Sequence, residues 1–308
     1  VYIIIAQKTL DICFKLVYHV AYAGLAAAPG EPCAAGGMRV FRFSDGEPLQ
    51  PFLASVRFTD RNYLVGAKAA VSASPGDGWR ISAALDARTG RERWHIDTPT
   101  PIIGQGLVDG RGRDAALYIG LGNGTMAKIA VRDGRILWRY DYGRGQSQGQ
   151  PALADGKLVF GAWNRHLYCL DAATGSLRWK WTNGAKSLFL SPGNIVPRIA
   201  GGRVFIDAPD RAVTCLDLAS GSVVWRCTDY KAREASGMSA DGKRFYVKTM
   251  DGELLAVDTA PDDFRRLWIA PAGFGYDYTA CPVTVSGGIA YLADLSLIHI
   301  SEPTRLRR

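Results

Sequence analysis

The sequence has few of the residues that bind metal ions and no recognisable metal-binding spacing. Its 308 residues include four histidines and six cysteines, and no two cysteines are spaced as in a CxxC motif. Structural zinc sites use four such ligands at short, characteristic spacings, so the sequence argues against one. The irregular cysteine spacing does not indicate a disulfide framework, although an even count by itself does not exclude disulfides.

Blocks of like charge are also missing. The net charge is +8 and the isoelectric point is about 9.2, but the basic side chains are scattered and alternate with Asp and Glu. No basic run is interleaved with aromatic residues in the way that RNA-binding motifs are. We therefore expect a solvated basic surface and no nucleic-acid partner.

The chain has no apolar segment long enough to span a bilayer. The apolar stretch at 16–28 contains His19 and two tyrosines, and it is well short of the roughly 20 residues that a spanning helix needs. We therefore expect no transmembrane segment. The overall composition, 47% hydrophobic and 21% charged, is typical of a globular protein and not of a disordered one.

Glycine, by contrast, is abundant. The 35 glycines are about 11% of the chain, above the usual level of about 7%. Segment 155–179 shows how they are used: Gly156 opens a strand, a polar loop at 163–165 leads into a second strand, and a tight turn at 171–175 leads into a third. Short strands punctuated by Gly and Asp predict a β-sheet unit.

This unit recurs along the chain. Two combs of aromatic residues keep the same period of 41 to 46 residues. Tryptophan closes each unit, and a Tyr or Phe marks a central strand. The tryptophans are Trp94, Trp138, Trp179, Trp225 and Trp268, and the strand aromatics are Tyr118, Phe160, Phe205, Tyr246 and Tyr291. A period in the forties with three or four strands per repeat predicts the blades of a β-propeller.

A turn motif identifies the repeat more closely. The pattern Asp-x-x-Thr/Ser-Gly-x-x-x-Trp occurs at 86–94, 171–179 and 217–225, each time preceded two positions earlier by a small residue. It resembles the tryptophan-docking repeat of the PQQ-like (pyrroloquinoline-quinone-like) β-propellers, and the resemblance covers about 63–294. Two copies depart from the pattern, because one has Ala130 in the Asp position and another has Pro261 and two aspartates in place of the tight turn.

Each motif position has an expected structural role. Gly permits a positive φ in a tight turn, the Asp side chain caps nearby backbone N–H groups, and the Trp is expected to lie between neighbouring blades. The small residue before the Asp is Cys169 in one copy and Cys215 in the next. We expect both to be small core residues, with a redox pair as the alternative. The expected docking residues are Asp86, Gly90, Trp94, Gly134, Trp138, Asp171, Gly175, Trp179, Asp217, Gly221, Trp225, Asp258 and Trp268.

The sequence therefore predicts an all-β fold, a β-propeller of four-stranded blades with an incomplete ring. The predicted blades are 63–94, 102–138, 151–181, 195–225 and 236–268, with the start of a sixth at 281. Because propellers close their ring to remove open sheet edges, we expect a parent of seven or eight blades. The predicted propeller domain is 46–294.

The two ends are expected to lie outside this domain. Residues 1–45 form an unassigned segment that is either weakly signal-like or out of frame. Residues 295–308 contain LSLIHISEPTR, which resembles a translated adapter from sequencing libraries, and we expect this segment to be an artefact.

One face of a propeller carries the loops between blades together with the loops that join the two middle strands of each blade. We expect this face to bind a polar ligand or a peptide. The expected binding residues are Asn123, Gln148, Trp163, Arg165, Asp210, Arg211, Arg233, Glu234 and Asp251. The sequence indicates no catalytic residue and no metal ligand.

The resemblance implies a non-catalytic module of the bacterial cell envelope that binds or scaffolds other proteins. It is similar to the assembly-factor lipoproteins of the outer membrane, so the implied partners are proteins or peptides, bound in some cases by β-strand addition. The implied location is periplasmic or outer-membrane-associated. No cofactor is expected for this class.

Two alternatives remain open from the sequence. A quinoprotein dehydrogenase would, by resemblance, need PQQ, calcium, an Asp base and an adjacent cysteine pair, and no two cysteines here are adjacent. The chain also resembles the propeller half of calcineurin-like metallophosphoesterase proteins. It has neither the Asp-x-His nor the Gly-Asn-His motif of their catalytic half. Enzymatic activity is therefore not expected of this chain, but it stays an open alternative.

Overall fold

The computed structural model describes residues 55–58, 62–66, 79–86, 92–98, 102, 104–122, 124–207, 209–272, 283–286 and 288–291. These residues form strands, turns and two short 3-10 helices, with no α-helix among them. The predicted terminal segments 1–45 and 295–308 lie outside the described residues, as do Gly90 and Asn123.

The strands form five four-stranded sheets and one two-stranded sheet, which we call blades 1 to 5 and the start of blade 6. Blade 1 contains β1 (Ser55–Phe58), β2 (Asn62–Gly66), β3 (Trp79–Asp86) and β4 (Glu92–Thr98). Blade 2 contains β5 (Leu107–Asp109), η1 (Gly112–Asp114), β6 (Ala116–Gly120), β7 (Thr125–Ala130) and β8 (Ile136–Asp141). Blade 3 contains β9 (Ala152–Ala154), β10 (Lys157–Gly161), β11 (Leu167–Asp171) and β12 (Leu177–Trp181), and is followed by η2 (Leu188–Leu190).

The remaining sheets follow the same plan. Blade 4 contains β13 (Arg198–Ala200), β14 (Arg203–Asp207), β15 (Val213–Asp217) and β16 (Val223–Cys227). Blade 5 contains β17 (Ala232–Met238), β18 (Arg244–Thr249), β19 (Glu253–Asp258) and β20 (Arg266–Pro271). Blade 6 begins with β21 (Thr284–Ser286) and β22 (Ile289–Tyr291).

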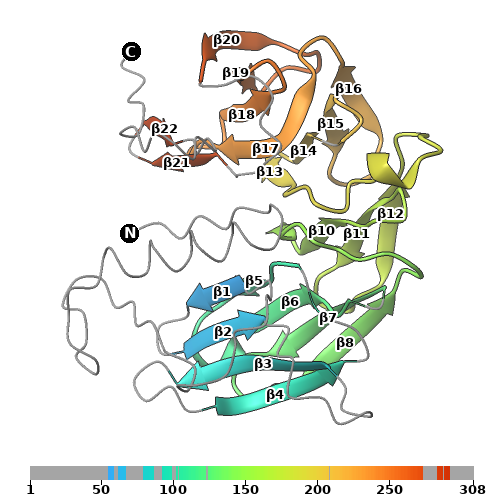
Figure 1. Ribbon diagram of the computed structural model, residues 1–308, viewed down its shortest axis with the longest axis vertical. Helices are drawn as coiled ribbons and strands as arrows, with labels where there is room; N and C mark the ends of the chain where they lie inside the picture. Colours follow the sequence, from blue (N-terminus) through green and yellow to red (C-terminus); the bar gives the residue numbers. More distant parts are fainter. Residues whose placement is uncertain are drawn as a thin grey trace, which may run out of the picture.

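Within each blade the strands pair in sequence order, and every pairing is antiparallel. The blades succeed one another from the lower to the upper part of Figure 1, and the ring is not closed. The predicted all-β propeller with five blades and the start of a sixth is thus confirmed.

The hydrophobic core lies between the blades. Each buried cluster draws its side chains from two consecutive blades. In the cluster between blades 3 and 4, for example, Val159 and Trp179 pack with Val204 and Leu216. The middle strands of an inner blade are therefore covered on both faces, which explains the nearly continuous burial of β10 and β14.

The predicted start of two blades was wrong. Blade 1 begins with β1 at Ser55 and not at 63, since β1 is a four-residue strand without any repeat motif. Blade 5 begins at Ala232 and not at 236, so Arg233 and Glu234 belong to strand β17 and not to a loop. A register shift between Ala232 and Ser236 makes this strand irregular, which hides its alternation in the sequence.

Candidate functional site

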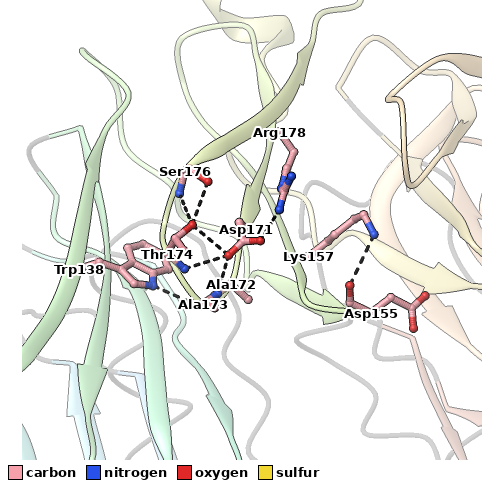
Figure 2. Close-up of polar contacts among 9 residues, drawn as sticks. All are labelled: Trp138, Asp155, Lys157, Asp171, Ala172, Ala173, Thr174, Ser176 and Arg178. Atoms are coloured by element: carbon pink, nitrogen blue, oxygen red, sulfur yellow. Dashed lines mark hydrogen bonds and ion pairs between the residues drawn. The ribbon is translucent and has the colours of Figure 1, made fainter.

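The tight turn between β11 and β12 is held by the carboxylate of Asp171. One of its oxygens, Oδ1, accepts hydrogen bonds from the backbone N–H groups of Ala173 and Thr174 at 3.0 and 2.9 Å and from the Thr174 hydroxyl at 3.0 Å. The other oxygen pairs with the Arg178 guanidinium at 2.6 Å (Figure 2). These contacts, with Arg178 contributing most, hold the pKa of Asp171 well below its usual range. The turn is therefore fixed while its carboxylate is ionised.

The same turn receives a tryptophan from the preceding blade. The indole N–H of Trp138 donates to the carbonyl of Ala172 at 3.2 Å (Figure 2). Gly175, at φ +75°, lies against the indole ring, and a Cβ atom there would be 2.6 Å from a ring carbon. Glycine is thus required both by the backbone conformation and by the close approach of the ring.

Two further seams between blades repeat this geometry. Trp94 donates to the carbonyl of Val131 and packs on Gly134, and Trp179 donates to the carbonyl of Leu218 and packs on Gly221. Both indole hydrogen bonds measure 2.9 Å. In these three seams the tryptophan of one blade rests on the turn of the next.

The departure at Ala130 leaves the turn of blade 2 intact. The backbone bond from Gly134 N–H to the Ala130 carbonyl, at 2.9 Å, matches the bond from Gly175 N–H to the Asp171 carbonyl at 2.8 Å. In addition, Asp133 accepts from the N–H of Arg135 at 3.1 Å. The turn therefore needs its backbone hydrogen bond and its glycine more than it needs the Asp side chain.

The departure in blade 5 has a larger effect. Asp258 caps the N–H of Ala260 at 3.0 Å, but the chain then bulges through 261–263. Trp225 packs edge-on against Phe264 with ring centroids 5.4 Å apart, and its buried indole N–H has no acceptor in the part of the chain that the structure describes. Trp268, which closes blade 5, is 37% exposed.

Of the other expected docking residues, the structure describes Asp217 and Asp86, together with the two cysteines that precede the motif. Asp217 caps the turn of blade 4 by accepting from the Ser220 N–H and hydroxyl, both at 2.7 Å. Asp86 ends strand β3. Cys169 and Cys215 are free thiols, fully buried in strands of different blades. Burial raises the pKa of each thiol to about 12, so both are protonated packing residues at neutral pH.

Three of the expected binding residues, Gln148, Trp163 and Arg165, lie in loops that contact one another. The backbone of Trp163 donates to Gln146 at 2.9 Å, and the N–H of Gln148 donates to Gly193 at 2.7 Å. Arg165 is exposed, and its backbone N–H donates to the Ser191 hydroxyl at 3.0 Å. The middle-strand loop of blade 3 thus touches the interblade loops on both sides of it.

The remaining expected binding residues form ion pairs within the chain. They are Asp210, Arg211, Arg233, Glu234 and Asp251. Asp210 contacts Arg226 at 2.5 Å and Asn183 at 2.8 Å, and its side chain is nearly buried. Glu234, also nearly buried, lies 3.3 Å from Arg211 and 3.8 Å from Arg233. Asp251 lies 3.5 Å from Lys231, with both side chains exposed. These ion pairs join loops to strands, so most of the charged side chains in this set are already neutralised by a partner within the chain.

Sequence reasoning missed the most exposed apolar feature of this face. Phe189 is 85% exposed and Leu188 is 56% exposed, although both belong to the short helix η2. The Ser187 hydroxyl caps η2 by accepting from Phe189 N–H, and Asn183 donates to the Leu190 carbonyl at 3.0 Å. The signal was present as the apolar triplet at 188–190 within a polar interblade loop. We name Leu188 and Phe189 the apolar turn.

Exposed basic side chains lie in the loops that surround the apolar turn. They are Arg144, Arg165 and Lys186. None forms an ion pair with another described residue. The face therefore combines a fixed apolar protrusion with unneutralised positive charge.

Comparison with known proteins places the fold. The family model described as "Outer membrane protein assembly factor BamB" matches residues 76–190 and 122–272. The chain belongs to this family of PQQ-like propellers. The two matches overlap and together span blades 2 to 5.

Individual relatives match a smaller part of this chain than the family model does. A quinohemoprotein alcohol dehydrogenase of Comamonas testosteroni is 26% identical over 33% of this chain and 17% of the relative. The dehydrogenase subunit of a quinone-dependent alcohol dehydrogenase of Gluconobacter oxydans is 28% identical over the same shares. The chain thus matches about a sixth of the length of these relatives.

One solved structure supports the fold, and a second is reported for comparison. A quinohemoprotein alcohol dehydrogenase of Pseudomonas putida HK5 superposes with a TM-score of 0.50 at 14% identity, over 71% of this chain and 43% of that one. BamB from Moraxella catarrhalis is 17% identical with a TM-score of 0.46, over 78% of this chain and 82% of that one.

The described residues show no candidate metal site. In the ranges given above, no three His, Cys, Asp or Glu side chains gather so as to hold a metal ion. The three described cysteines are Cys169, Cys215 and Cys227, and no two of them are adjacent in the sequence. No helix in these ranges is long and apolar enough to cross a membrane.

Proposed function

We propose that this chain is a non-catalytic binding propeller of the bacterial cell envelope, which docks a protein partner through the apolar turn and its basic surroundings. The observation that carries the proposal is a phenylalanine held in solvent by a capped helical turn. Exposed apolar side chains that are rigid and rimmed by polar groups are typical of interaction sites. The family description supports the proposed periplasmic or outer-membrane location and the proposed role in outer-membrane assembly.

The internally paired charges support the same proposal. The ion pairs of Asp210 and Arg211 fix the loop between β14 and β15, and Asn183 links this loop to Leu190 of η2. Little conformational entropy is therefore lost when a partner binds. The positive charges of Arg144, Arg165 and Lys186 favour a partner surface that carries carboxylates around an apolar pocket. No cofactor takes part in this function.

The test is binding of the full-length protein to purified outer-membrane assembly machinery from the same bacterium. Removing a fully desolvated phenylalanine costs about 1.5–3 kcal/mol, so we expect Phe189→Ala to weaken binding by roughly 10- to 100-fold. Leu267→Ala is the matched control, because Leu267 is 42% exposed on β20, away from the interblade loops. Equal affinity of Phe189→Ala and the unaltered protein would refute the proposed docking site.

A second candidate is a part of a quinoprotein dehydrogenase, which the sequence similarity to alcohol dehydrogenases favours. Titration of PQQ and calcium into the full-length protein distinguishes the two. Saturable quinone binding together with dye-linked alcohol oxidation would establish the dehydrogenase and overturn the binding module. Quinone binding that does not saturate supports the binding module.

A further inference from the structure

The seam between blades 4 and 5 is built differently from the three seams before it. Its tryptophan, Trp225, lacks the indole hydrogen bond that Trp94, Trp138 and Trp179 make. In its place Arg203 of β14 reaches across to the Pro261 carbonyl and to Asp262. The outer part of this seam is therefore joined by an arginine and not by the docking contact.

The inner part of the same seam contains an aspartate where two other blades have glycine. Asp207 ends the second strand of blade 4, as Gly120 and Gly161 end the second strands of blades 2 and 3. At Gly161 the next interblade loop approaches so closely that a Cβ atom would lie 1.8 Å from the Pro192 carbonyl oxygen. In blade 4 this space has to hold a carboxyl group, and the facing strand β17 bulges at Ala232–Ser236.

The Asp207 carboxyl is fully buried and only partly satisfied. The Ser236 hydroxyl donates to Oδ1 at 3.1 Å, whereas Oδ2 has no hydrogen-bond partner among the described residues. Arg198 on β13 donates to the Ser236 carbonyl at 2.8 Å, and its buried Nε has no hydrogen-bond partner among the described residues. The described residues show no ion pair between Arg198 and Asp207 within 4.0 Å. A buried carboxylate without a cation in contact costs several kcal/mol, and the protonated acid avoids this cost.

The surrounding groups that act on Asp207 lie on two strands, β13 and β17. Burial raises its pKa well above the usual value, and the negative charge of Glu234 on β17 raises it further. The hydrogen bond from Ser236 and the positive charge of Arg198 act in the opposite direction and are outweighed. The other buried cations of blade 5, Arg233 and Lys248, lie on β17 and β18.

We propose that the seam between blades 4 and 5 is a proton-operated joint, in which Asp207 must carry a proton for β13, β14 and β17 to pack together. Loss of the proton places a bare carboxylate beside Glu234 in a seam whose tryptophan has no acceptor for its indole N–H among the described residues, and the seam loosens. Glu234 also pairs with Arg211 on the binding face, so the joint connects proton binding to the arrangement of that face. This inference does not depend on the identity of the partner.

The direction of the pH dependence follows from proton binding. In the unfolded chain Asp loses its proton near pH 3.9, whereas in the folded chain it loses it at a higher pH. Between these two pH values the folded state holds one more proton, so stability falls as pH rises through the window and is level above it. If the folded state binds one proton more than the unfolded state, Tm decreases by about 2–5 °C per pH unit in a chain of this size.

The experiment compares the thermal unfolding of the full chain between pH 4.5 and 8 with that of Asp207→Asn, which imitates the protonated acid. We expect the Tm of the unaltered protein to fall with pH, and that of Asp207→Asn to change less and to exceed it at pH 8. Asp155→Asn is the matched control, since Asp155 is exposed in a turn at φ +48°, which Asn tolerates. This variant should follow the unaltered protein.

Hydrogen exchange locates the effect. After correction for the intrinsic exchange rate at pH 8, the amides of β17 should exchange faster than those of β10. Asp207→Asn should remove this difference between the two strands. Parallel Tm curves for the unaltered protein and Asp207→Asn would overturn the proposal. If Asp207→Asn does not fold, infrared spectra of the protein with isotope-labelled aspartate decide, because a carboxylic-acid band at pH 6 supports a protonated buried Asp and its absence refutes one.

Discussion

Replacing Trp179 with alanine should break the contact between blades 3 and 4. Burying an indole of about 150–250 Å² at ~25 cal/mol/Å² contributes roughly 4–6 kcal/mol, which is an upper estimate because the unfolded chain already buries part of this area. Trp179 is 8% exposed and its N–H donates to Leu218 at 2.9 Å. Truncations of buried Trp typically cost about 3–5 kcal/mol, and we expect Trp179→Ala to lie in this range.

The form of the unfolding curve provides a stricter test than its midpoint. In a repeat protein stability is approximately a sum of unit terms and nearest-neighbour interface terms. Trp179→Ala should therefore uncouple blades 1–3 from blades 4 and 5, so that urea unfolding followed by circular dichroism shows two transitions instead of one.

Two further variants control for the loss of a large side chain as such. Trp268→Ala removes the corresponding residue of blade 5, which is 37% exposed, and should cost about half as much in free energy. Trp179→Phe keeps one buried aromatic ring but removes the N–H donor and part of the indole. The unpaired Leu218 carbonyl alone should cost about 1–3 kcal/mol, so we expect a loss between this value and that of Trp179→Ala. If Trp179→Ala and Trp268→Ala lose equal free energy within about 0.5 kcal/mol, the docking contact does not stabilise the seam.

Three shorter predictions concern the turn and the core. Gly221→Ala should destabilise the chain, because φ is +73° and the new Cβ would lie 2.6 Å from the Trp179 ring; urea unfolding measures the loss, and unchanged stability would contradict it. The pKa of Asp171 is lowered on folding, chiefly by Arg178, so its contribution is complete above about pH 4 and lost as pH falls below that value. Asp171→Asn should flatten the acid limb of a plot of stability against pH. Cys169, whose thiol pKa is raised to about 12 by burial, should resist alkylation at pH 8 until the chain unfolds, as mass spectrometry would show.

The fold could be predicted because the information for a blade is local. The Asp-x-x-Thr-Gly turn at 171–175 depends on contacts within four residues, and the tryptophan that docks on it recurs at a fixed period. Local patterns did not reveal the ends of blades, where the four-residue strand β1 and the bulged strand β17 carry no motif.

The candidate site was harder to predict because its contacts are distant in sequence. Asp210 pairs with Arg226, 16 residues away, and Arg211 with Glu234, 23 residues away. A polar residue in a loop therefore shows the same local pattern whether it binds a partner or a neighbouring loop. The exposed Phe189 could have been found from its apolar neighbours. Asp207 could have been found by aligning the strand ends at Gly120 and Gly161 with it.

The two departures from the motif remove different contacts from their turns. This difference indicates which seams of the propeller are more stable. Ala130 removes a side-chain cap, but the backbone hydrogen bond and Gly134 remain, so Trp94 still docks. The insertion at 261–263 removes the glycine itself and the acceptor geometry, so Trp225 keeps only its ring contacts. Because interface terms add along a repeat protein, the seam between blades 4 and 5 is the weakest of the four. A buried, partly satisfied carboxyl destabilises any seam that contains it, and its ionisation has the largest structural effect where the docking contact is already missing.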